Sequence, residues 1–385
     1  MKRKLRMGMV GGGRDSFIGP VHRMAAQMDG KIELVCGAFS SSPEKSRLSG
    51  QDLLLPPERV YGTYEEMLQK EAQLPDGDRM DFVSIVTPNN VHHPVALAAL
   101  EAGFHVVCDK PMTLDLDEAK ELERKVQETG RLFCLTHNYT GYPMVKEARA
   151  LVAEGRLGAV RRVVVEYPQG WLATDIETTG LKQAVWRTDP QIAGASSCMG
   201  DIGTHCENLA EYITGLQITE MCADLTTFVS GRRLEDDGSV LLRLGDSARG
   251  ILWASQIAIG QENTLTIRVY GEKGSLEWHQ EEPNTLLVRW PDRPTETRRT
   301  ATDFVGEAAS SSVRLPAGHP EGYLEAFANV YSSFADALSD TLWGDRSDRT
   351  KYDYPDVQDG VRGMAFLDAV VRSAGSQKKW VEVLA

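Results

Sequence analysis

The first 135 residues alternate short apolar runs with segments that carry a helical hydrophobic pattern. The run Leu5–Val10 leads directly into three glycines, and further apolar runs lie at residues 32–39, 81–88, 105–111 and 131–139. Between the first two runs we expect a helix opened by Pro20, with four apolar residues on one face: Val21, Met24, Ala25 and Met28. This alternation is typical of βαβ units, and strands with almost no charge are buried on both faces. The sequence therefore predicts an α/β domain with a doubly wound parallel sheet over residues 1–137.

From about residue 160 the pattern changes to longer strands at hairpin spacing, which is typical of an antiparallel sheet. A helix over 207–215 interrupts these strands, and two apolar-striped helices, over 323–338 and 357–374, are expected to cover the sheet. The segment Pro291–Pro320 has little periodicity and is interpreted as a long surface loop. We therefore expect residues 138–385 to form an α+β domain with a large, predominantly antiparallel open sheet, which binds substrate and self-associates.

Composition excludes several classes of function. The 385 residues carry 42 Lys and Arg against 55 Asp and Glu, a net charge of −13, which disfavours binding to nucleic acid or to an anionic membrane surface. No window is apolar enough for a membrane span, and the N-terminal segment reaches glycine before a signal-peptide core could form, so a cytoplasmic location is expected. The six cysteines show no C-x-x-C pair, which indicates reduced, buried thiols and neither disulfides nor a structural zinc site.

The glycines after the first strand resemble a dinucleotide-binding turn of the type G-x-G-x-x-G. Gly11 and Gly13 fit its first two positions, the third falls on Ser16, and the next glycine is Gly19, so the loop is about three residues longer than usual. We expect backbone amides here and the helix N-terminus to bind a pyrophosphate. The candidate cofactor-binding residues of this turn are Gly11, Gly13, Arg14, Ser16, Phe17 and Ile18.

The end of the second strand normally selects between NAD and NADP. Here Ser40 and Ser41 are followed by Lys45, and no carboxylate appears before Glu44, which favours NADP. The alternative interpretation is that these serines simply begin a helix after Pro43, which leaves NAD open.

Three motifs in order resemble the glucose–fructose oxidoreductase / inositol dehydrogenase (Gfo/Idh/MocA) family. They are the stretched glycine segment ending at His22, the strand end Cys108–Pro111, and Gly200–His205, which is similar to the family's D-x-G-x-H. Thr87-Pro88-Asn89 followed by His92, and Trp186-Arg187, extend the likeness over nearly the whole chain. Two features depart from the family pattern: Asp109 replaces the usual Glu of E-K-P, and the glycine loop is longer.

The resemblance implies a Rossmann domain followed by a substrate domain, and an NAD(P)-dependent dehydrogenase that oxidises a secondary hydroxyl of a sugar, glycoside or cyclitol to a ketone. It implies His205 as general base, Asp201 as a substrate-binding partner and Lys110 as the ammonium that polarises the reacting oxygen. Near the cofactor it places Lys110 as well, together with five further residues: Thr87, Pro88, Asn89, His92 and Asp109. Substrate contacts are expected from Asn138, Tyr139, Trp171 and Arg187.

The residues themselves are consistent with these roles. Histidine has the side-chain pKa closest to neutrality, and the spacing Asp201-x-x-x-His205 would place both side chains on one face if the segment is helical. The same pair could bind a metal ion, but a third ligand at matching spacing is missing, so no metal site is expected.

Two alternatives remain: a dehydrogenase or reductase of a non-sugar substrate such as a dihydrodiol, and a non-catalytic nucleotide-binding sensor. The presence of Lys110, Asp201 and His205 together argues against the sensor. Because an open antiparallel sheet leaves an apolar face, we also expect a homodimer or homotetramer formed through that sheet.

Overall fold

The computed structural model describes residues 2–344 and 351–384. These residues form two compact units. The first unit comprises the described residues within 1–113, 117–138 and 327–361, and the second comprises those within 114–116, 139–326 and 362–385.

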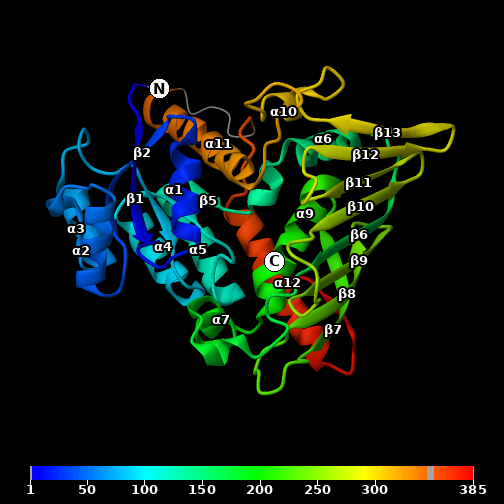
Figure 1. Cartoon of the computed structure of the whole chain (residues 1–385), viewed down its shortest axis with the longest axis horizontal. Helices are drawn as coiled ribbons and strands as arrows, with labels where there is room; N and C mark the ends of the chain where they lie inside the picture. The colour runs from blue at the N-terminus through cyan, green and yellow to red at the C-terminus, as the bar shows by residue number, and fades with distance from the viewer. Residues whose placement is uncertain (1, 345–350, 385) are drawn as a thin grey trace. The chain divides into compact units, whose positions relative to one another are not determined.

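The first unit is built on a parallel sheet of five strands in the order β2-β1-β3-β4-β5 (Figure 1). Its strands are β1 (Leu5–Gly11), β2 (Ile32–Ala38), β3 (Phe82–Val86), β4 (His105–Cys108) and β5 (Phe133–Leu135). The helices that alternate with them are α1 (Ile18–Met28), α2 (Pro43–Asp52), α3 (Tyr64–Gln73), α4 (His92–Glu101) and α5 (Leu116–Thr129). The predicted parallel α/β fold is confirmed.

Helix α1 differs in detail from its prediction. It begins at Ile18, two residues before Pro20. Met24 and Met28, expected on the buried face, are 47 % and 38 % exposed, whereas Val21 and Ala25 are buried. Gly19 is buried in the first turn of the helix, so the buried face includes small residues that a search for large apolar side chains overlooks.

Helix α11 (Tyr323–Trp343) packs on the parallel sheet over most of its length. The Phe334 ring lies 5.2 Å from the ring of Phe82 on β3, and the Tyr331 hydroxyl lies 2.9 Å from Ser84 Oγ on the same strand. The expectation that this helix covers the antiparallel sheet is therefore wrong for residues 327–343. An apolar stripe predicts burial, but it does not identify the sheet that receives it.

The second unit contains nine strands in the order β13-β12-β11-β10-β6-β9-β8-β7-β14. Neighbouring strands are antiparallel except β6 and β9, which run parallel. The strands are β6 (Val160–Pro168), β7 (Ile218–Thr226), β8 (Asp237–Leu244), β9 (Ala248–Ser255), β10 (Thr266–Gly271), β11 (Ser275–His279), β12 (Thr285–Trp290), β13 (Arg293–Arg299) and β14 (Trp380–Glu382). The predicted predominantly antiparallel sheet is confirmed.

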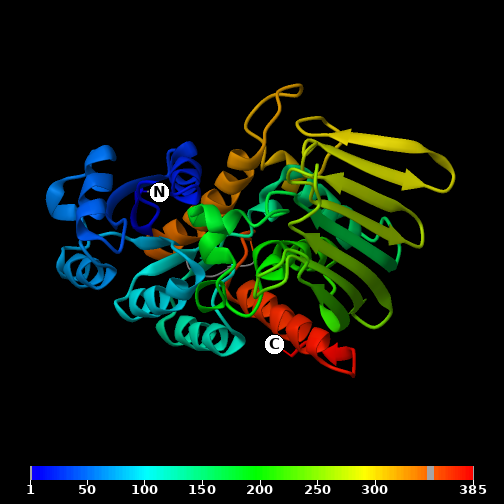
Figure 2. The ribbon, with the colours of Figure 1, turned by 60° about the horizontal axis from the view of Figure 1, so that its bottom comes forward.

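The helices of the second unit lie mainly on one face of this sheet, as Figures 1 and 2 show for α6 (Pro143–Ala153) and α9 (Thr204–Thr214). Val163 and Val165 on β6 are buried, while Val164 between them is partly exposed, as expected for a sheet covered on one side. The remaining helices are α7 (Lys182–Arg187), α8 (Pro190–Ala193), α10 (Glu307–Ser310) and α12 (Val357–Gly375).

The segment Pro291–Pro320 is not a continuous loop as expected, because it contains β13 and the short helix α10. Strand β13 lies at the edge of the sheet, where a proline and charged side chains are tolerated because one side of the strand makes no ladder bonds. Its residues are mostly exposed, so the sequence carries no apolar alternation there. No helix among the described residues is both long and apolar enough to cross a membrane.

Candidate functional site

The glycine turn of the first unit brings strand β1 and helix α1 into close approach. Gly11 and Gly12 have φ values of +80° and +68°, a backbone conformation that residues with a side chain rarely adopt. A Cβ on Gly19 would lie 2.4 Å from the Cα of Gly12, closer than real atoms come. Gly19, rather than Ser16, therefore allows the close helix–strand packing that the third glycine of the fingerprint provides. The turn has the backbone form that fits a dinucleotide pyrophosphate.

The inserted residues of this turn are held by local hydrogen bonds. Ser16 Oγ accepts a bond of 3.2 Å from the backbone N–H of Gly19. Arg14 donates from its backbone to Ser49 Oγ, and its guanidinium pairs with Asp52 at the surface. A Cβ on Gly13 would lie 2.6 Å from that same Ser49 Oγ. Phe17 is 68 % exposed beside the turn, and Ile18 starts α1.

The serines after β2 begin a helix. Ser42 caps α2, its side chain accepting from the backbone N–H of Lys45, and Ser40 Oγ accepts from the backbone N–H of Ser42. Ser41 lies exposed between them. The hydroxyls of Ser40 and Ser42 at this strand end therefore accept backbone hydrogen bonds at the start of α2.

His92 connects the turns that follow β3 and β4. Its side chain is buried, with Nδ1 2.8 Å from the Pro111 carbonyl and Nε2 2.9 Å from the Thr87 carbonyl. Burial lowers the pKa of His92, although the charge of Asp109 opposes this shift. The His92 side chain thus connects the turn of Thr87, Pro88 and Asn89 to the Lys110-Pro111 turn.

Asp109 is held at the end of β4 by neighbours within the first unit. Its Oδ1 accepts from the backbone N–H of Lys110 at 3.0 Å and from Thr136 Oγ1 at 2.9 Å, and His22 Nε2 lies 3.8 Å away. Burial alone would raise the pKa of Asp109, but its interaction with His22 and the charge of Lys110 hold it well below its usual range. The shorter acid that replaces the family's Glu is therefore an ionised carboxylate.

Two residues of this region were not identified from the sequence as site residues. His22 Nδ1 lies 2.8 Å from the Tyr331 hydroxyl on α11, so the motif histidine joins Asp109 to a distant helix. His137 follows β5 beside the predicted Asn138, and both are buried. Burial, with the positive charge of Lys110, lowers the pKa of His137 to about 3. The sequence signals are the place of His22 at the end of the glycine motif and the position of His137 at a strand end.

Asp201 lies in a π-helical turn, Met199–Gly203, that continues into α9. The segment is helical, but a π turn is wider than an α turn, so the α-helical i,i+4 spacing assumed for Asp201 and His205 does not apply. Asp201 Oδ2 accepts from Arg187 Nε at 3.1 Å and from Gln256 Nε2 at 2.9 Å. The structure thus brings Arg187 and Asp201 together and adds Gln256, which the sequence analysis missed.

His205 lies against a group of aromatic hydroxyls. Its ring packs edge-on against Tyr139 with the centroids 4.7 Å apart, and it is 5 % exposed. The Tyr139 and Tyr167 hydroxyls are hydrogen-bonded to each other, and Asn263 bonds to both. Burial raises the pKa of Tyr139 to about 12, so this phenol stays neutral at ordinary pH.

Trp171 extends the same network. Its Nε1 donates to Gln169 Oε1 at 3.1 Å, and Gln169 Nε2 donates to Asn263 Oδ1 at 2.7 Å. The Arg187 guanidinium lies 5.9 Å from the Trp171 ring centroid. The second unit therefore brings together five predicted residues: Tyr139, Trp171, Arg187, Asp201 and His205. Three amide side chains that were not predicted also take part in these contacts: Gln169, Gln256 and Asn263.

The predicted residues divide between the units. Lys110, Asn138 and the cofactor-side residues belong to the first unit, and the other predicted substrate-side residues belong to the second. In the part of the chain that the structure describes, no group of three or more His, Cys, Asp or Glu side chains could hold a metal ion.

Comparison with known proteins identifies both halves of the chain. Residues 5–137 match the family described as "Oxidoreductase family, NAD-binding Rossmann fold", and residues 145–277 match the "GFO/IDH/MocA C-terminal domain". The chain is 35 % identical to the uncharacterized oxidoreductase YfiI of Bacillus subtilis, over 99 % of this chain and 98 % of that protein. It is 25 % identical to levoglucosan dehydrogenase of Pseudarthrobacter phenanthrenivorans over the same shares of the two chains.

Among solved structures, an inositol dehydrogenase homolog from Azotobacter vinelandii in complex with NAD+ matches with a TM-score of 0.96 and 36 % identity, over 99 % of this chain and 98 % of that one. The same homolog complexed with NADH and myo-inositol matches with a TM-score of 0.93, 35 % identity and the same coverage.

Proposed function

Since the chain belongs to the GFO/IDH/MocA oxidoreductase family, with its NAD-binding Rossmann fold, we propose that it oxidises a secondary hydroxyl of a sugar, glycoside or cyclitol to a ketone. Two observations together support this proposal. The whole fold is similar to that of a homolog complexed with NADH and myo-inositol, and the second unit carries the acid Asp201 and the imidazole of His205. An alcohol oxidation needs a proton acceptor, and a buried imidazole supplies one.

We propose that the His205 imidazole takes the hydroxyl proton as the carbon–hydrogen bond breaks. Lys110 donates to the reacting oxygen and stabilises its developing negative charge. Asp201 accepts a hydrogen bond from a neighbouring substrate hydroxyl, with its carboxylate held ready by Arg187 and Gln256. A bound nicotinamide would supply the hydride acceptor, so that the substrate, on losing one proton and one hydride, would become a ketone.

The residues that would hold the cofactor are those of the glycine turn, the Ser40-Ser41 strand end, the Thr87–Asn89 turn with His92, and Asp109. The lack of a carboxylate before Glu44 favours NADP. The capping of α2 by Ser42 gives the serine segment a structural role, which leaves NAD open, and the NAD-bound homolog favours NAD. We propose NAD as the preferred cofactor. A kcat/KM for NADP+ above that for NAD+ would reverse this assignment.

We also propose self-association through the open face of the nine-stranded sheet. Three residues on strands β8, β9 and β10 expose apolar surface there: Leu241, Ile251 and Tyr270 are 47 %, 38 % and 40 % exposed, and strand β6 lies between β9 and β10. Exposed apolar patches of this kind mark interfaces. Light scattering at micromolar concentration should give the molar mass of a homodimer or homotetramer. Ile251→Glu should shift the molar mass towards that of a monomer. A monomeric parent protein would refute the proposal.

The activity is tested by following nicotinamide absorbance with a panel of cyclitols and sugars, including myo-inositol and levoglucosan, each with NAD+ and NADP+. Turnover of a panel member supports the proposal. Turnover of a dihydrodiol alone would instead support a non-sugar dehydrogenase. Binding of NADH, seen by its fluorescence, with no turnover of any substrate would favour a nucleotide-binding sensor.

A further inference from the structure

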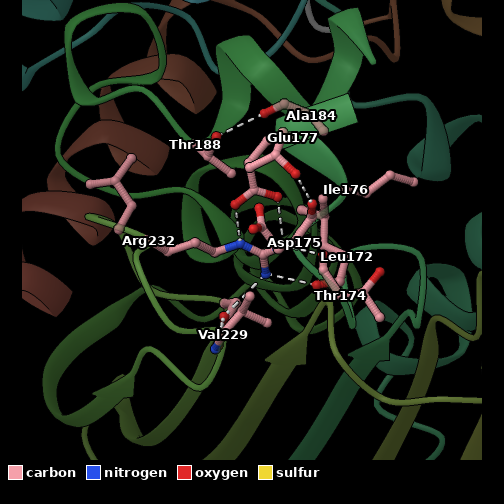
Figure 3. Close-up of polar contacts among 12 residues, drawn as sticks. Leu172, Thr174, Asp175, Ile176, Glu177, Ala184, Thr188, Val229 and Arg232 are labelled. Atoms are coloured by element: carbon pink, nitrogen blue, oxygen red, sulfur yellow. Dashed lines mark hydrogen bonds and ion pairs between the residues drawn. The ribbon is translucent and has the colours of Figure 1, made fainter. Parts of the chain in front are cut away.

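The loop between β7 and β8, residues 227–236, carries a buried group of charged side chains outside the site described above. The side chains of Arg232 and Asp236 are each 2 % exposed, and Glu235 is also buried. Figure 3 shows Arg232 reaching between Glu177 and Thr174, on the segment that follows Trp171. Arg233, the next residue, is by contrast 61 % exposed.

Arg232 uses all five of its N–H donors. Two of them bind the Glu177 carboxylate in a bidentate pair of 2.8 and 2.9 Å. Two more reach the backbone carbonyls of Leu172 and Thr174, both at 2.7 Å, and the fifth reaches Asp236 Oδ2 at 3.1 Å. The planar fork of an arginine can satisfy this set, and a lysine with its three donors at one point cannot. Arg232 thus fixes the backbone directly after Trp171.

Glu235 holds a different segment, the one that leads to Asp201. Its Oε1 accepts from Ser196 Oγ at 2.5 Å and from the backbone N–H groups of Ser197 and Met199 at 3.1 and 3.0 Å. The last of these begins the π turn that contains Asp201. The carboxylate therefore satisfies donors at the start of the helical segment that carries both Asp201 and His205.

The same loop also touches the backbone of Gln256. The carbonyl of Asp236 accepts from the Gln256 N–H at 2.9 Å, and the carbonyl of Gln256 accepts from the Leu172 N–H at 3.0 Å. Gln256 in turn donates to Asp201. One short loop thus contacts three segments, far apart in the sequence, that present Trp171, Asp201 and Gln256.

We propose that Arg232 and Glu235 are positioning residues that set the geometry of the Asp201 side of the substrate site; this deepens the proposed function and rests on it. Removing an arginine and its carboxylate partners from water is costly, so such a group adds little net stability compared with apolar packing. Its hydrogen bonds do fix orientation, and a displacement of about 1 Å in a reacting site can cost about 100-fold in rate.

The first test needs no substrate. Hydrogen–deuterium exchange of the full-length protein is compared between the parent, Arg232→Lys and the control Arg233→Lys. The control replaces the neighbouring exposed arginine, which pairs with Asp189. We expect faster exchange in residues 171–180 for Arg232→Lys alone, with peptides of the first unit unchanged. Unchanged exchange at 171–180, or faster exchange throughout the chain, would overturn the positioning role of Arg232.

The second test separates positioning from folding by kinetics. With myo-inositol, or the panel member that is turned over best, we expect Arg232→Lys to lower kcat/KM for that substrate roughly 10- to 100-fold while KM for NAD+ stays the same. Glu235→Gln keeps an oxygen acceptor at Oε1 and should retain most activity, whereas Glu235→Ala should not. Equal loss in Glu235→Gln and Glu235→Ala, or a parallel change in NAD+ binding, would contradict the inference.

The two tests can fail separately. Absence of turnover by the parent protein would sink the proposed function without touching the exchange result. Parent turnover combined with normal kinetics for Arg232→Lys would sink the inference while leaving the function intact.

Discussion

The first unit shapes its candidate binding features mainly with backbone, and the second shapes its own mainly with side chains. In the first, glycines at Gly11, Gly12 and Gly19 remove atoms so that a strand and a helix can approach each other. In the second, Arg187, Gln256 and Arg232 add donors that hold carboxylates and carbonyls in place. The first unit should therefore be most sensitive to added atoms, and the second to removed polar groups.

The largest effect is expected from removing the proton acceptor of the second unit. His205→Ala should lower kcat by roughly 100- to 10,000-fold, the range that general acid–base catalysis contributes. NADH affinity, measured by fluorescence titration, should stay close to that of the parent, because the glycine turn belongs to the other unit. His319→Ala, at an exposed histidine, is the control. Near-normal turnover by His205→Ala would refute its role as base.

Adding one methyl group should harm the first unit selectively. In Gly19→Ala the new Cβ would lie 2.4 Å from Gly12, so the turn must open, at a cost of about 1–3 kcal/mol in the free energy of unfolding. NADH binding should weaken along with stability. Gly77→Ala is the matched control, since a Cβ there meets nothing within 4 Å. If both variants bind NADH equally well, the close approach at Gly19 does not matter for the cofactor.

Changing one polar group should harm the second unit selectively. Gln256→Glu replaces the donor to Asp201 with a second carboxylate. A buried polar group left unsatisfied costs roughly 1–3 kcal/mol, so we expect kcat/KM for the substrate to fall about tenfold. KM for NAD+ should not change. Gln261→Glu, at an exposed amide, is the control. A change in KM for NAD+ equal to that for the substrate would break the proposed division between units.

The smallest effect on activity is expected from a pH dependence of stability that belongs to the first unit. Because burial lowers the pKa of folded His137 to about 3, the unfolded chain takes up a proton below its ordinary pKa of 6.5 while the folded chain does not. Stability should therefore decrease as pH falls from 6.5 towards 3, by up to about 1.4 kcal/mol per pH unit for this one proton. His137→Gln should flatten the slope measured by urea unfolding, and the exposed His319→Gln should not. Identical slopes in all three proteins would show that His137 keeps its proton affinity on folding.

The same contrast explains which features could be predicted from the sequence. The parallel strands and the glycine turn depend on residues close together in the chain, so their pattern is visible directly. Gln256 and Arg232 act through partners 55 residues away from them, Asp201 and Glu177, and a lone glutamine or arginine has no local signal that reveals such a partner. The strand β13 was missed for a related reason, since an exposed edge strand needs no apolar alternation.

The π turn at Met199–Gly203 marks a further limit of sequence patterns. The spacing of Asp201 and His205 predicts a shared face only if the segment is an α-helix, and the structure contains a helical segment that begins with a π turn. Whether a segment winds as π or α depends on what packs around it, here including the donors and acceptors around Glu235.

The packing of α11 on β3 affects how the protein can be made. During synthesis the ribosome releases Phe82 and Ser84 long before Phe334 and Tyr331, which are separated from them by most of the second unit. The place of α11 on the parallel sheet, beside α1, therefore stays uncovered until nearly the whole polypeptide has emerged. A fragment ending at residue 137 should consequently aggregate when expressed alone, and adding residues 327–361 as a separate peptide should improve its solubility.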